Sequence, residues 1–463
     1  MNISFLGACG TVTGSLYLIE TSSNKKILVD AGMFQGEFED LNFEPFPFDP
    51  YEIDLILLTH AHLDHTGLIP KLVRNGFEGK ILGTTPTLDL TRIILMDAAK
   101  LQSEEFESLE KRNLRKGIET REPLYTLEDA ISAMSYFTPI RAYDEEIEIF
   151  DDLKVTWRDA GHILGSAFLE MNVDGRKVIF SGDLGNRNKP IVRDPESIKM
   201  KDADVIVVES TYGSRIHKSV EDSKEELLGA LQDTLDKGNV IIPSFAIERA
   251  QDLLYYIREF KETGELRNDI KVFLDSPLAI SATNIFRAHK EVFDDDARQL
   301  LKEKKDIFSF PNLFFTRSRE ASVQINNITK GAIIIAGSGM CTGGRIKHHL
   351  KHNLWRDECA VIFVGYQANG TLGRSLVDGA KEVEIYGETI KVNSRIFTIN
   401  GLSAHADQQE ILDWMDSLER DSQVFVTHGE NTERDTLAVK LQELGFKTVR
   451  KPALKENFFL KEA

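Results

Sequence analysis

The sequence predicts an α/β protein in which one α/β domain is interrupted by a second, inserted α/β domain. Three observations support this fold class. Residues 1–209 are rich in short apolar strands separated by glycine turns. Between about residues 210 and 380, strands alternate with amphipathic helices, as in parallel βαβ units. Short strands then return, so 381–463 is expected to complete the domain that 1–209 begins.

In the first segment, apolar runs bounded by turn residues predict the strands. The run 53–59 is almost entirely apolar, which favours a strand buried on both faces. Asp174-Gly175, between two such runs, is a hairpin turn signal. The predicted strands are 3–6, 15–21, 26–30, 53–59, 154–158, 167–173 and 177–181, and helices are expected from His65 to Gly76 and over 88–116.

The insertion and the last segment follow from the same patterns. In the insertion, strands are predicted at 240–242, 272–275, 332–336 and 360–364, with helices at 248–260 and 345–354. In the last segment, strands are predicted at 383–386, 395–399 and 423–427, with helices at 408–418 and 432–444.

The composition is that of an ordinary soluble protein, with 41% hydrophobic and 28% charged residues. No stretch approaches the ~20 apolar residues that a membrane-spanning helix needs. The N-terminus lacks the basic start and the long apolar run of a signal peptide. The three cysteines lie far apart and form no CxxC pair, which is typical of reduced thiols. We therefore expect a cytoplasmic protein that does not associate with membranes.

The net charge of −18 argues against a basic surface for non-specific nucleic-acid binding. Two interpretations remain. The substrate is not a polyanion, or a local basic cleft with bound metal cations outweighs the overall negative charge at short range.

Three of the eleven histidines lie within six residues, in the run THAHLDH at 59–65. His60 and His62 are two residues apart, so on an extended segment their side chains point the same way. Asp64 and His65 follow as the chain turns into a helix. Imidazole nitrogen and carboxylate oxygen suit zinc, so the run predicts a metal site at a strand's C-terminal end. A helix N-terminus capped by Asp64, with solvated histidines, is the alternative.

Three further candidate ligands follow other predicted strands. They are His162 in a glycine-flanked loop, Asp183 in SGDLG and His428 in VTHGE. Each residue alone is more often part of a turn or a cap. Their repeated position at strand ends favours one shared metal centre.

Together these motifs resemble the metallo-β-lactamase-fold hydrolases, through HxHxDH at 60–65, His162 and Asp183. Three more motifs resemble the β-CASP nucleases, namely VVESTYG at 207–213, LSAHAD at 402–407 and VTHGE at 426–430. That family includes the cleavage-and-polyadenylation endonuclease, ribonuclease J and short archaeal and bacterial relatives. The resemblance spans nearly the whole chain. It implies a metallo-β-lactamase αββα sandwich with an inserted parallel α/β β-CASP domain.

The resemblance also implies two Zn2+ per chain, with Mn2+ as an alternative. One zinc is assigned to His60, His62 and His162, the other to Asp64, His65 and His428, and Asp183 bridges the two. A histidine at position 428 favours RNA, because DNA-directed relatives tend to lack it.

Phosphodiester hydrolysis needs a nucleophile, charge neutralisation and a proton for the leaving group. Two metals ~3.5–4 Å apart supply the first two, because they lower the pKa of a bridging water to about 7 and so form a bridging hydroxide. The resemblance implies that His405 protonates the leaving ribose oxygen, and that Glu209 orients it and keeps it charged. The catalytic residues are therefore His405, Glu209 and the metal ligand Asp64. From the residues alone, the favoured interpretation of His405 is a histidine in the N-cap region of the helix that begins near Asp407.

The candidate substrate contacts lie mainly in the insertion. Ser338 and Gly339 belong to a glycine-rich loop between a strand and a helix, where backbone N–H groups bind anions; a plain glycine turn is the alternative. Arg345 opens a basic helix whose cations would attract a polyanion. The alternative is that these residues form only a solvated helix face. Arg374 and Ser403 complete the predicted set.

The predicted function is a zinc-dependent ribonuclease whose cleft between two domains admits single-stranded RNA. The sequence leaves open endonuclease or 5′-exonuclease action, and a homodimer. A DNA nuclease of the same fold, a small-molecule metallo-hydrolase and a non-catalytic scaffold are the alternatives. The scaffold predicts a degraded ligand set, whereas here every ligand position is filled.

Overall fold

The structure is a computed structural model that describes residues 1–303, 306–368 and 370–460. The chain forms two compact units. Unit 1 comprises Met1–Arg187, Asp194–Ile216 and the described residues from His405 onward, and unit 2 comprises Asn188–Arg193 and His217–Ala404. The domain boundaries expected after residues 209 and 380 stay a prediction.

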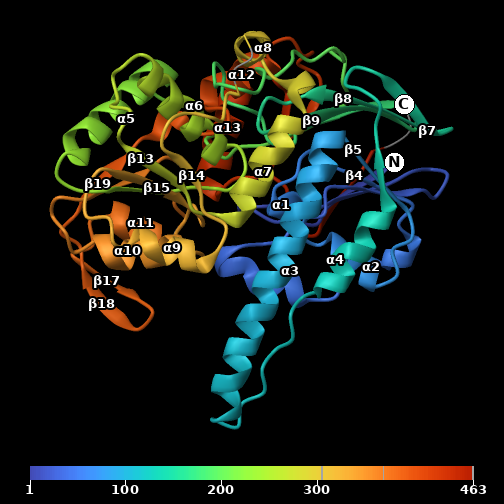
Figure 1. The fold of residues 1–463 in the computed structure, drawn as a ribbon. Helices are drawn as coiled ribbons and strands as arrows, with labels where there is room; N and C mark the ends of the chain where they lie inside the picture. Colours follow the sequence, from blue (N-terminus) through green and yellow to red (C-terminus); the bar gives the residue numbers. More distant parts are fainter. Residues whose placement is uncertain (304–305, 369, 461–463) are drawn as a thin grey trace. The chain divides into compact units, whose positions relative to one another are not determined.

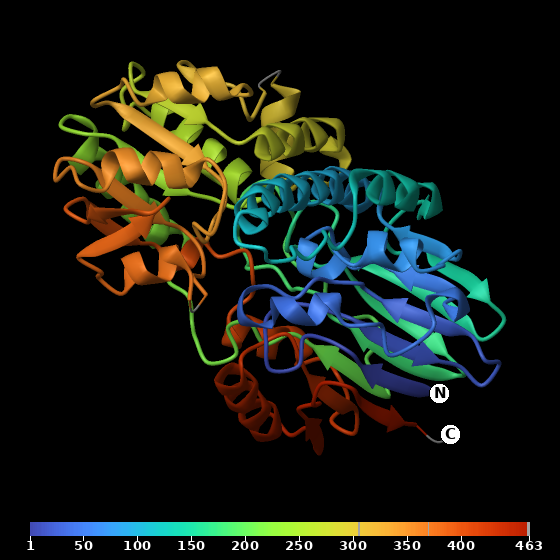
Figure 2. The same cartoon turned by 90° about the horizontal axis from the view of Figure 1, so that it is seen from below.

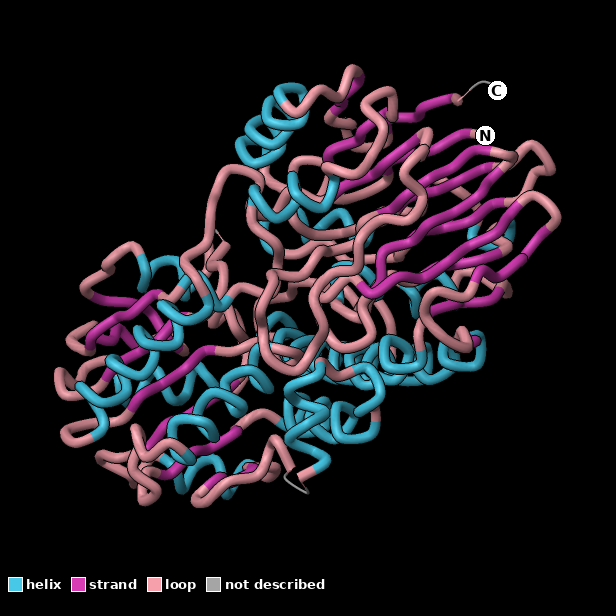
Figure 3. The backbone as a smooth tube through the Cα atoms, turned by 90° about the horizontal axis from the view of Figure 1, so that it is seen from above, coloured by secondary structure: helices cyan, strands magenta, loops and turns pink. Residues whose placement is uncertain are grey.

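Unit 1 contains two seven-stranded sheets, whose strands are visible as stacked layers in Figures 2 and 3. The first sheet runs in the order β22 (Glu456–Phe459), β1 (Asn2–Phe5), β2 (Tyr17–Glu20), β3 (Lys26–Val29), β4 (Leu55–Leu57), β5 (Lys80–Gly83) and β6 (Phe137–Pro139). The second runs in the order β21 (Thr448–Arg450), β20 (Gln423–Val426), β11 (Val205–Val208), β10 (Arg176–Phe180), β9 (Ala167–Val173), β8 (Leu153–Asp159) and β7 (Glu146–Phe150).

Central strands of unit 1, such as β4 and β11, are apolar and buried on both faces. In β3, Ile27 and Val29 pack in the core between the two sheets, whereas Leu28 packs against helices. In β10, Phe180 lies in the core between the sheets and Ile179 on the opposite face. Successive side chains of a strand point to opposite faces of its sheet. They therefore fill one core between the two sheets and a second core between each sheet and its helices.

Helices cover the outer face of each sheet of unit 1. Leu72 and Leu95 pack against the first sheet, and Trp414 and Leu437 pack against the second. This four-layer order confirms the predicted αββα sandwich. The helical elements are α1 (Leu63–Thr66), α2 (Ile69–Arg74), α3 (Thr85–Leu114), α4 (Leu127–Ala133), α12 (Gln408–Met415) and α13 (Asn431–Glu443), with 3-10 turns at Gly36–Phe43, Pro50–Glu52 and Met134–Tyr136.

Unit 2 is built on a six-stranded sheet in which every pairing is parallel, as predicted for the inserted region. Its strand order is β14 (Leu313–Phe315), β13 (Lys271–Leu274), β15 (Ala332–Ala336), β12 (Val240–Pro243), β16 (Ala360–Phe363) and β19 (Arg395–Thr398). The other elements are α5 (Val220–Leu235), α6 (Arg249–Glu262), α7 (Pro277–Ala288), α8 (Asp295–Lys302), α9 (Arg319–Ile325), α10 (Ile346–Asn353), α11 (Leu372–Val377), the hairpin β17 (Glu382–Ile385) and β18 (Glu388–Lys391), and 3-10 turns at Lys290–Val292 and Asn400–Leu402.

The strand order of unit 2 reverses between β12 and β15. The connection from β12 through α6 leads to β13 on one side of β15, whereas the connection from β15 through α10 leads past β12 to β16. Parallel crossovers are right-handed, so these two helices lie on opposite faces of the sheet, as Figure 1 shows. The gap between the loops after β12 and β15 is therefore a topological switch point, where open α/β sheets bind ligands.

Local signals explain several element ends. Asp174 and Gly175 both have positive φ, 52° and 72°, which suits the tight hairpin between β9 and β10. β4 is shorter than predicted because the N–H of Thr59 donates to the Asp30 carboxylate, 2.8 Å away, instead of to a neighbouring strand. Within the described residues, no helix combines the length and the apolar character that crossing a bilayer requires.

Candidate metal centre

All seven predicted metal ligands lie in unit 1, in segments that follow strands. The first sheet contributes the loop after β4, and the second contributes the loops after β8, β10 and β20. His60 and His62 precede α1, Asp64 and His65 lie in α1, His162 follows β8, Asp183 follows β10 and His428 follows β20.

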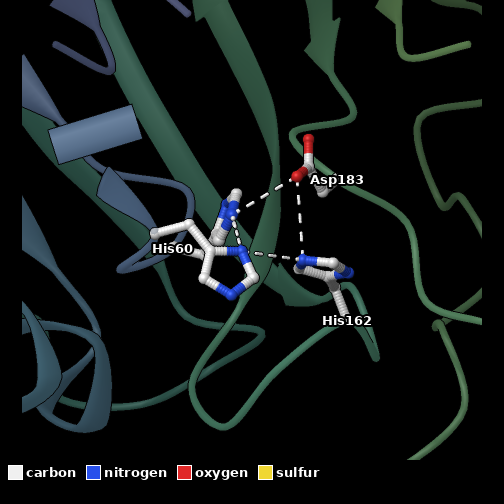
Figure 4. A group of neighbouring side chains, drawn as sticks. His60, His162 and Asp183 are labelled. Carbon is white, nitrogen blue, oxygen red and sulfur yellow. Dashed lines mark hydrogen bonds and ion pairs between the residues drawn. The ribbon is translucent and has the colours of Figure 1, made fainter. Parts of the chain in front are cut away.

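The first ligand group consists of His60, His62 and His162. His62 Nδ1 lies 3.2 Å from His60 Nε2 and 3.2 Å from His162 Nε2. Asp183 Oδ2 lies 3.4 Å from His60 Nε2 and 3.6 Å from His162 Nε2. Figure 4 shows His60 and His162 turned toward the Asp183 carboxylate.

The second ligand group consists of Asp64, His65 and His428. The Nε2 atoms of His65 and His428 are 3.2 Å apart, and Asp64 Oδ2 lies 3.5 Å from His428 Nε2. Asp183 Oδ1 lies 3.2 Å from His65 Nε2 and 3.6 Å from His428 Nε2. The two oxygens of one carboxylate therefore face two different groups.

The donor atoms of the first group fit a cation better than a hydrogen-bond network. Burial lowers the pKa of His62 to about 4 and lowers the pKa of His60 and His162 well below the usual range, so the rings are neutral. A neutral ring has one N–H, yet His62 Nδ1 faces two ring nitrogens at once. A tetrahedral zinc with Zn–N distances of about 2.0–2.1 Å sets its nitrogen ligands about 3.3 Å apart.

Asp183 supports the same conclusion. Its Oδ1 atom is buried and receives no hydrogen bond, although two histidine nitrogens lie within 3.6 Å. A buried carboxylate oxygen without a donor is costly unless a cation compensates it. The donor set of the described residues therefore suits metal binding.

Residues around the ligands hold the rings in place. His65 Nδ1 lies 2.7 Å from Asp30 Oδ2, and Thr59 Oγ1 donates to that same oxygen at 2.8 Å. Thr211 Oγ1 lies 3.1 Å from His428 Nδ1. Each of these contacts occupies the ring nitrogen that faces away from the ligand group, which fixes the ring orientation. The roles of Thr59 and Thr211 were missed from the sequence, because only the fold brings these residues to the rings.

Glu209 and His405 lie beside the first ligand group. Glu209 is buried and accepts hydrogen bonds from the backbone N–H groups of Leu184 (2.6 Å) and Thr211 (3.3 Å). His405 Nδ1 lies 3.2 Å from Glu209 Oε2 and 4.0 Å from Asp183 Oδ2. Asp183, Glu209 and His405 are also close enough to hold a cation themselves.

The charge state of His405 is set by two opposing causes. Burial disfavours the charged ring, but the negative charge of Glu209 and its hydrogen bond outweigh burial and raise the pKa of His405 above its usual value. The ring is partly accessible, since 20% of its side chain is exposed. A partly accessible imidazole whose protonated form is favoured in this way is suited to donate a proton.

The predicted substrate contacts lie in unit 2. Ser338 and Gly339 follow β15, and the Oγ of Ser338 accepts a hydrogen bond from the N–H of Gly343. Arg345 donates to the Asp275 carboxylate at 2.6 Å and to the carbonyl oxygens of Thr316 and Arg317. Arg374 donates to Asp378 at 2.9 Å, and Ser403 is buried. Their role in substrate binding stays a prediction.

A double-sheet sandwich with histidine and carboxylate ligands converging at strand ends defines a metallo-hydrolase of the metallo-β-lactamase fold. Family models agree along the chain. Residues 9–235 match the metallo-beta-lactamase superfamily, 250–376 match the Beta-Casp domain, and 389–452 match the Zn-dependent metallo-hydrolase RNA specificity domain.

Curated relatives extend the match over most of the chain. "Ribonuclease TTHA0252" of Thermus thermophilus is 37% identical and aligns with 93% of each chain. "Transcription termination factor FttA" of Methanosarcina mazei is 30% identical over 93% of this chain and 67% of its own. An "RNase J-like protein" of Methanocaldococcus jannaschii is 30% identical over 97% of this chain and 96% of its own.

A crystal structure of a protein of unknown function from Enterococcus faecalis V583 has the same fold, with a TM-score of 0.57 and 12% identity over 99% of both chains. The chain therefore belongs to the β-CASP ribonuclease family of the metallo-β-lactamase superfamily. The predicted family and the predicted enzyme class, a metal-dependent hydrolase, are confirmed.

Proposed function

We propose that this chain is a two-zinc ribonuclease that hydrolyses phosphodiester bonds of RNA. The observation that carries the proposal is the position of the Asp183 carboxylate. Its Oδ2 faces histidine nitrogens of the first ligand group and its Oδ1 faces those of the second, each within 3.6 Å. His60, His62 and His162 would hold the first zinc, Asp64, His65 and His428 would hold the second, and Asp183 faces both ligand groups. Manganese is the alternative ion.

When bound, such ions lower the pKa of water and neutralise charge on the phosphate oxygens. The residues of the chain orient this chemistry. Asp30 holds His65, and Thr211 holds His428, at the ring nitrogens opposite the ligand group. The rings therefore need no reorganisation when the substrate arrives, which is how a preformed polar site lowers a barrier.

His405 is the proton donor to the leaving ribose oxygen. Glu209 engages Nδ1, so Nε2 is the nitrogen that delivers the proton. The raised pKa of His405 supports this role, because it favours the protonated ring, which can give up its proton as charge develops on the leaving oxygen.

RNA is the proposed substrate, entering as a single strand. Three observations support RNA as the substrate: the RNA specificity model at 389–452, ribonuclease names among the relatives, and the histidine at position 428. The substrate contacts proposed in unit 2 are Ser338, Gly339, Arg345, Arg374 and Ser403. Endonuclease and 5′-exonuclease action both fit this proposal.

The test is cleavage of 5′-labelled and internally structured RNA, with matched DNA, by protein whose metal content has been measured. We expect two zinc ions per chain and cleavage of RNA in preference to DNA. The variant His428→Ala is expected to retain one ion and to lose most activity. Cleavage of neither polymer by fully loaded protein would exclude a nuclease, and equal cleavage of both would exclude RNA specificity.

A further inference from the structure

One aromatic side chain stands at the switch point of the unit 2 sheet. Phe245 lies two residues after the end of β12, in the loop that faces the glycine-rich loop after β15. Its exposed fraction is 39%, although apolar side chains of the adjoining strand, such as Ile241, are buried. The ring therefore presents a surface at the place where this sheet topology favours ligand binding.

Two glycines make room for the Phe245 ring. A Cβ built on Gly339 would lie 2.8 Å from the ring, and a Cβ on Gly365 would lie 3.7 Å from it. The ring thus rests against the backbones of the loops after β15 and β16. A side chain at position 339 would displace the ring, so glycine at this position allows the Phe245 ring to approach the backbone closely.

A buried glutamine ties these loops together. Gln367 Nε2 donates to the carbonyl oxygen of Gly339 at 3.1 Å and to that of Gly365 at 3.2 Å. Gln367 is itself 6% exposed. The support of the ring is therefore held by hydrogen bonds between the loops and not only by apolar contact.

The glycine-rich loop after β15, which supports the ring, also carries hydroxyl groups. Ser338 precedes Gly339, and its Oγ lies 3.1 Å from Thr342 Oγ1, which belongs to an exposed residue. A nucleotide has an apolar base face and a polar phosphate. An aromatic surface next to a glycine-rich loop with hydroxyl groups matches both parts.

Exposed phenylalanines are common, so Phe314 provides a comparison. It is 42% exposed, but it lies in the edge strand β14 and stacks on Phe273 at 5.1 Å between ring centroids. Phe314 is therefore part of an aromatic pair away from the switch point. Phe245 differs because its support is glycine backbone at two strand ends, those of β15 and β16.

We infer that Phe245 stacks on one nucleobase of the bound RNA, beside the loop proposed to contact its phosphate. The inference rests on the proposed RNA substrate and adds the residue that positions a base. Stacking requires only a π face, which every base has, so this contact favours single-stranded RNA without selecting a sequence.

The test compares Phe245→Leu with Phe245→Trp, and uses Phe314→Leu as the matched control. Loss of one stacked base is expected to raise KM for a short single-stranded RNA by on the order of tenfold or more, with kcat unchanged. Phe245→Trp should restore the KM, and Phe314→Leu should leave it as in the parent protein. Melting temperatures of all three variants report whether they fold.

An abasic nucleotide moved along the RNA identifies the stacked base. At one position it should raise KM for the parent protein but add nothing to the effect of Phe245→Leu, because both changes remove the same contact. If the two effects add at every position, or if Phe245→Leu leaves KM unchanged, Phe245 does not stack on a base.

A fluorescence measurement separates this inference from the ribonuclease proposal. RNA with 2-aminopurine at that position should lose fluorescence on binding the parent protein and not on binding Phe245→Leu. Quenching without cleavage would support the stacking and refute the hydrolysis. Cleavage with equal quenching by the parent protein and by Phe245→Leu would support the ribonuclease proposal and refute the stacking.

Discussion

Asp183 is the single residue on which both ligand groups depend. Its oxygens are 3.2–3.6 Å from nitrogen atoms of four histidines, two in each group. In the proposed two-zinc site, a carboxylate in this position would share its charge between the two cations. In the proposed mechanism His405 and Glu209, by contrast, act on the proton and belong to neither ligand group, so the two roles can be separated by substitution.

His405→Ala is expected to lower the rate of RNA cleavage by about 10²–10⁴-fold, which is the usual contribution of a positioned proton donor. Metal content should stay at the parent value, because neither ligand group includes His405. Single-turnover cleavage together with elemental analysis checks both statements. If the variant loses metal, the cation site formed by Asp183, Glu209 and His405 is the better description.

Glu209→Gln is expected to shift the pH dependence of kcat. Glu209 raises the pKa of His405, and removing its charge lowers that pKa. Activity that needs charged His405 is present below its pKa and lost above it, so the alkaline decline should begin at lower pH. A pH–rate profile measured at equal metal content checks this. An unchanged alkaline decline would mean that another group is titrating.

At the scale of elements, close backbone approaches hold the ligand loops together. A Cβ on Gly32 would lie 1.6 Å from the carbonyl oxygen of Asp64, and one on Gly185 would lie 1.9 Å from that of Gly161. The N–H of Ala31 also donates to the carbonyl oxygen of His65 at 2.7 Å. The loop after β3 therefore fixes α1, which carries part of the second ligand group.

Gly32→Ala should displace α1 and so weaken binding at the second group, because the added methyl group meets backbone that cannot move alone. We expect metal content to fall from two ions toward one. Gly229→Ala is the matched control, since its Cβ would meet nothing within 4 Å inside α5. It should keep both ions and gain about 0.5–1 kcal/mol of stability. Two ions in Gly32→Ala would contradict the expectation.

For the whole molecule, metal binding and stability are linked. Ions that bind the native ligand groups and not the unfolded chain stabilise the fold, by about 4 kcal/mol at a thousandfold excess over the dissociation constant. Treatment with EDTA should therefore lower the melting temperature of the parent protein by on the order of 10 °C. The shift should be smaller in His428→Ala. Equal shifts in both proteins would mean that EDTA acts elsewhere.

The chain carries a net charge of −18, so bound cations also matter for its encounter with a polyanion. Its acidic composition offers RNA little long-range attraction, and the ligand groups are themselves acidic in part. The negative net charge argued against a nucleic-acid substrate. It is compatible with such a substrate only where bound cations or basic side chains make the local potential positive.

Much of this architecture follows from local patterns. Apolar runs predicted most of the sandwich strands and the parallel insertion, because both faces of these strands are buried. The seven candidate ligands could be identified because they follow four strands whose apolar runs are visible in the sequence. The pairing of β19 (Arg395–Thr398) with β16 could not, since a short strand does not reveal its neighbour.

The sequence by itself determined which side chains are candidates for the metal centre, because ligand chemistry and position after a strand are local properties. Only the tertiary structure decided which oxygen of Asp183 faces which ligand group, that Asp30 holds His65, and that Phe245 stands at a switch point. Each of these depends on strand order and on backbones that meet from distant parts of the chain. Such contacts are set by packing and leave no spacing signal in the sequence.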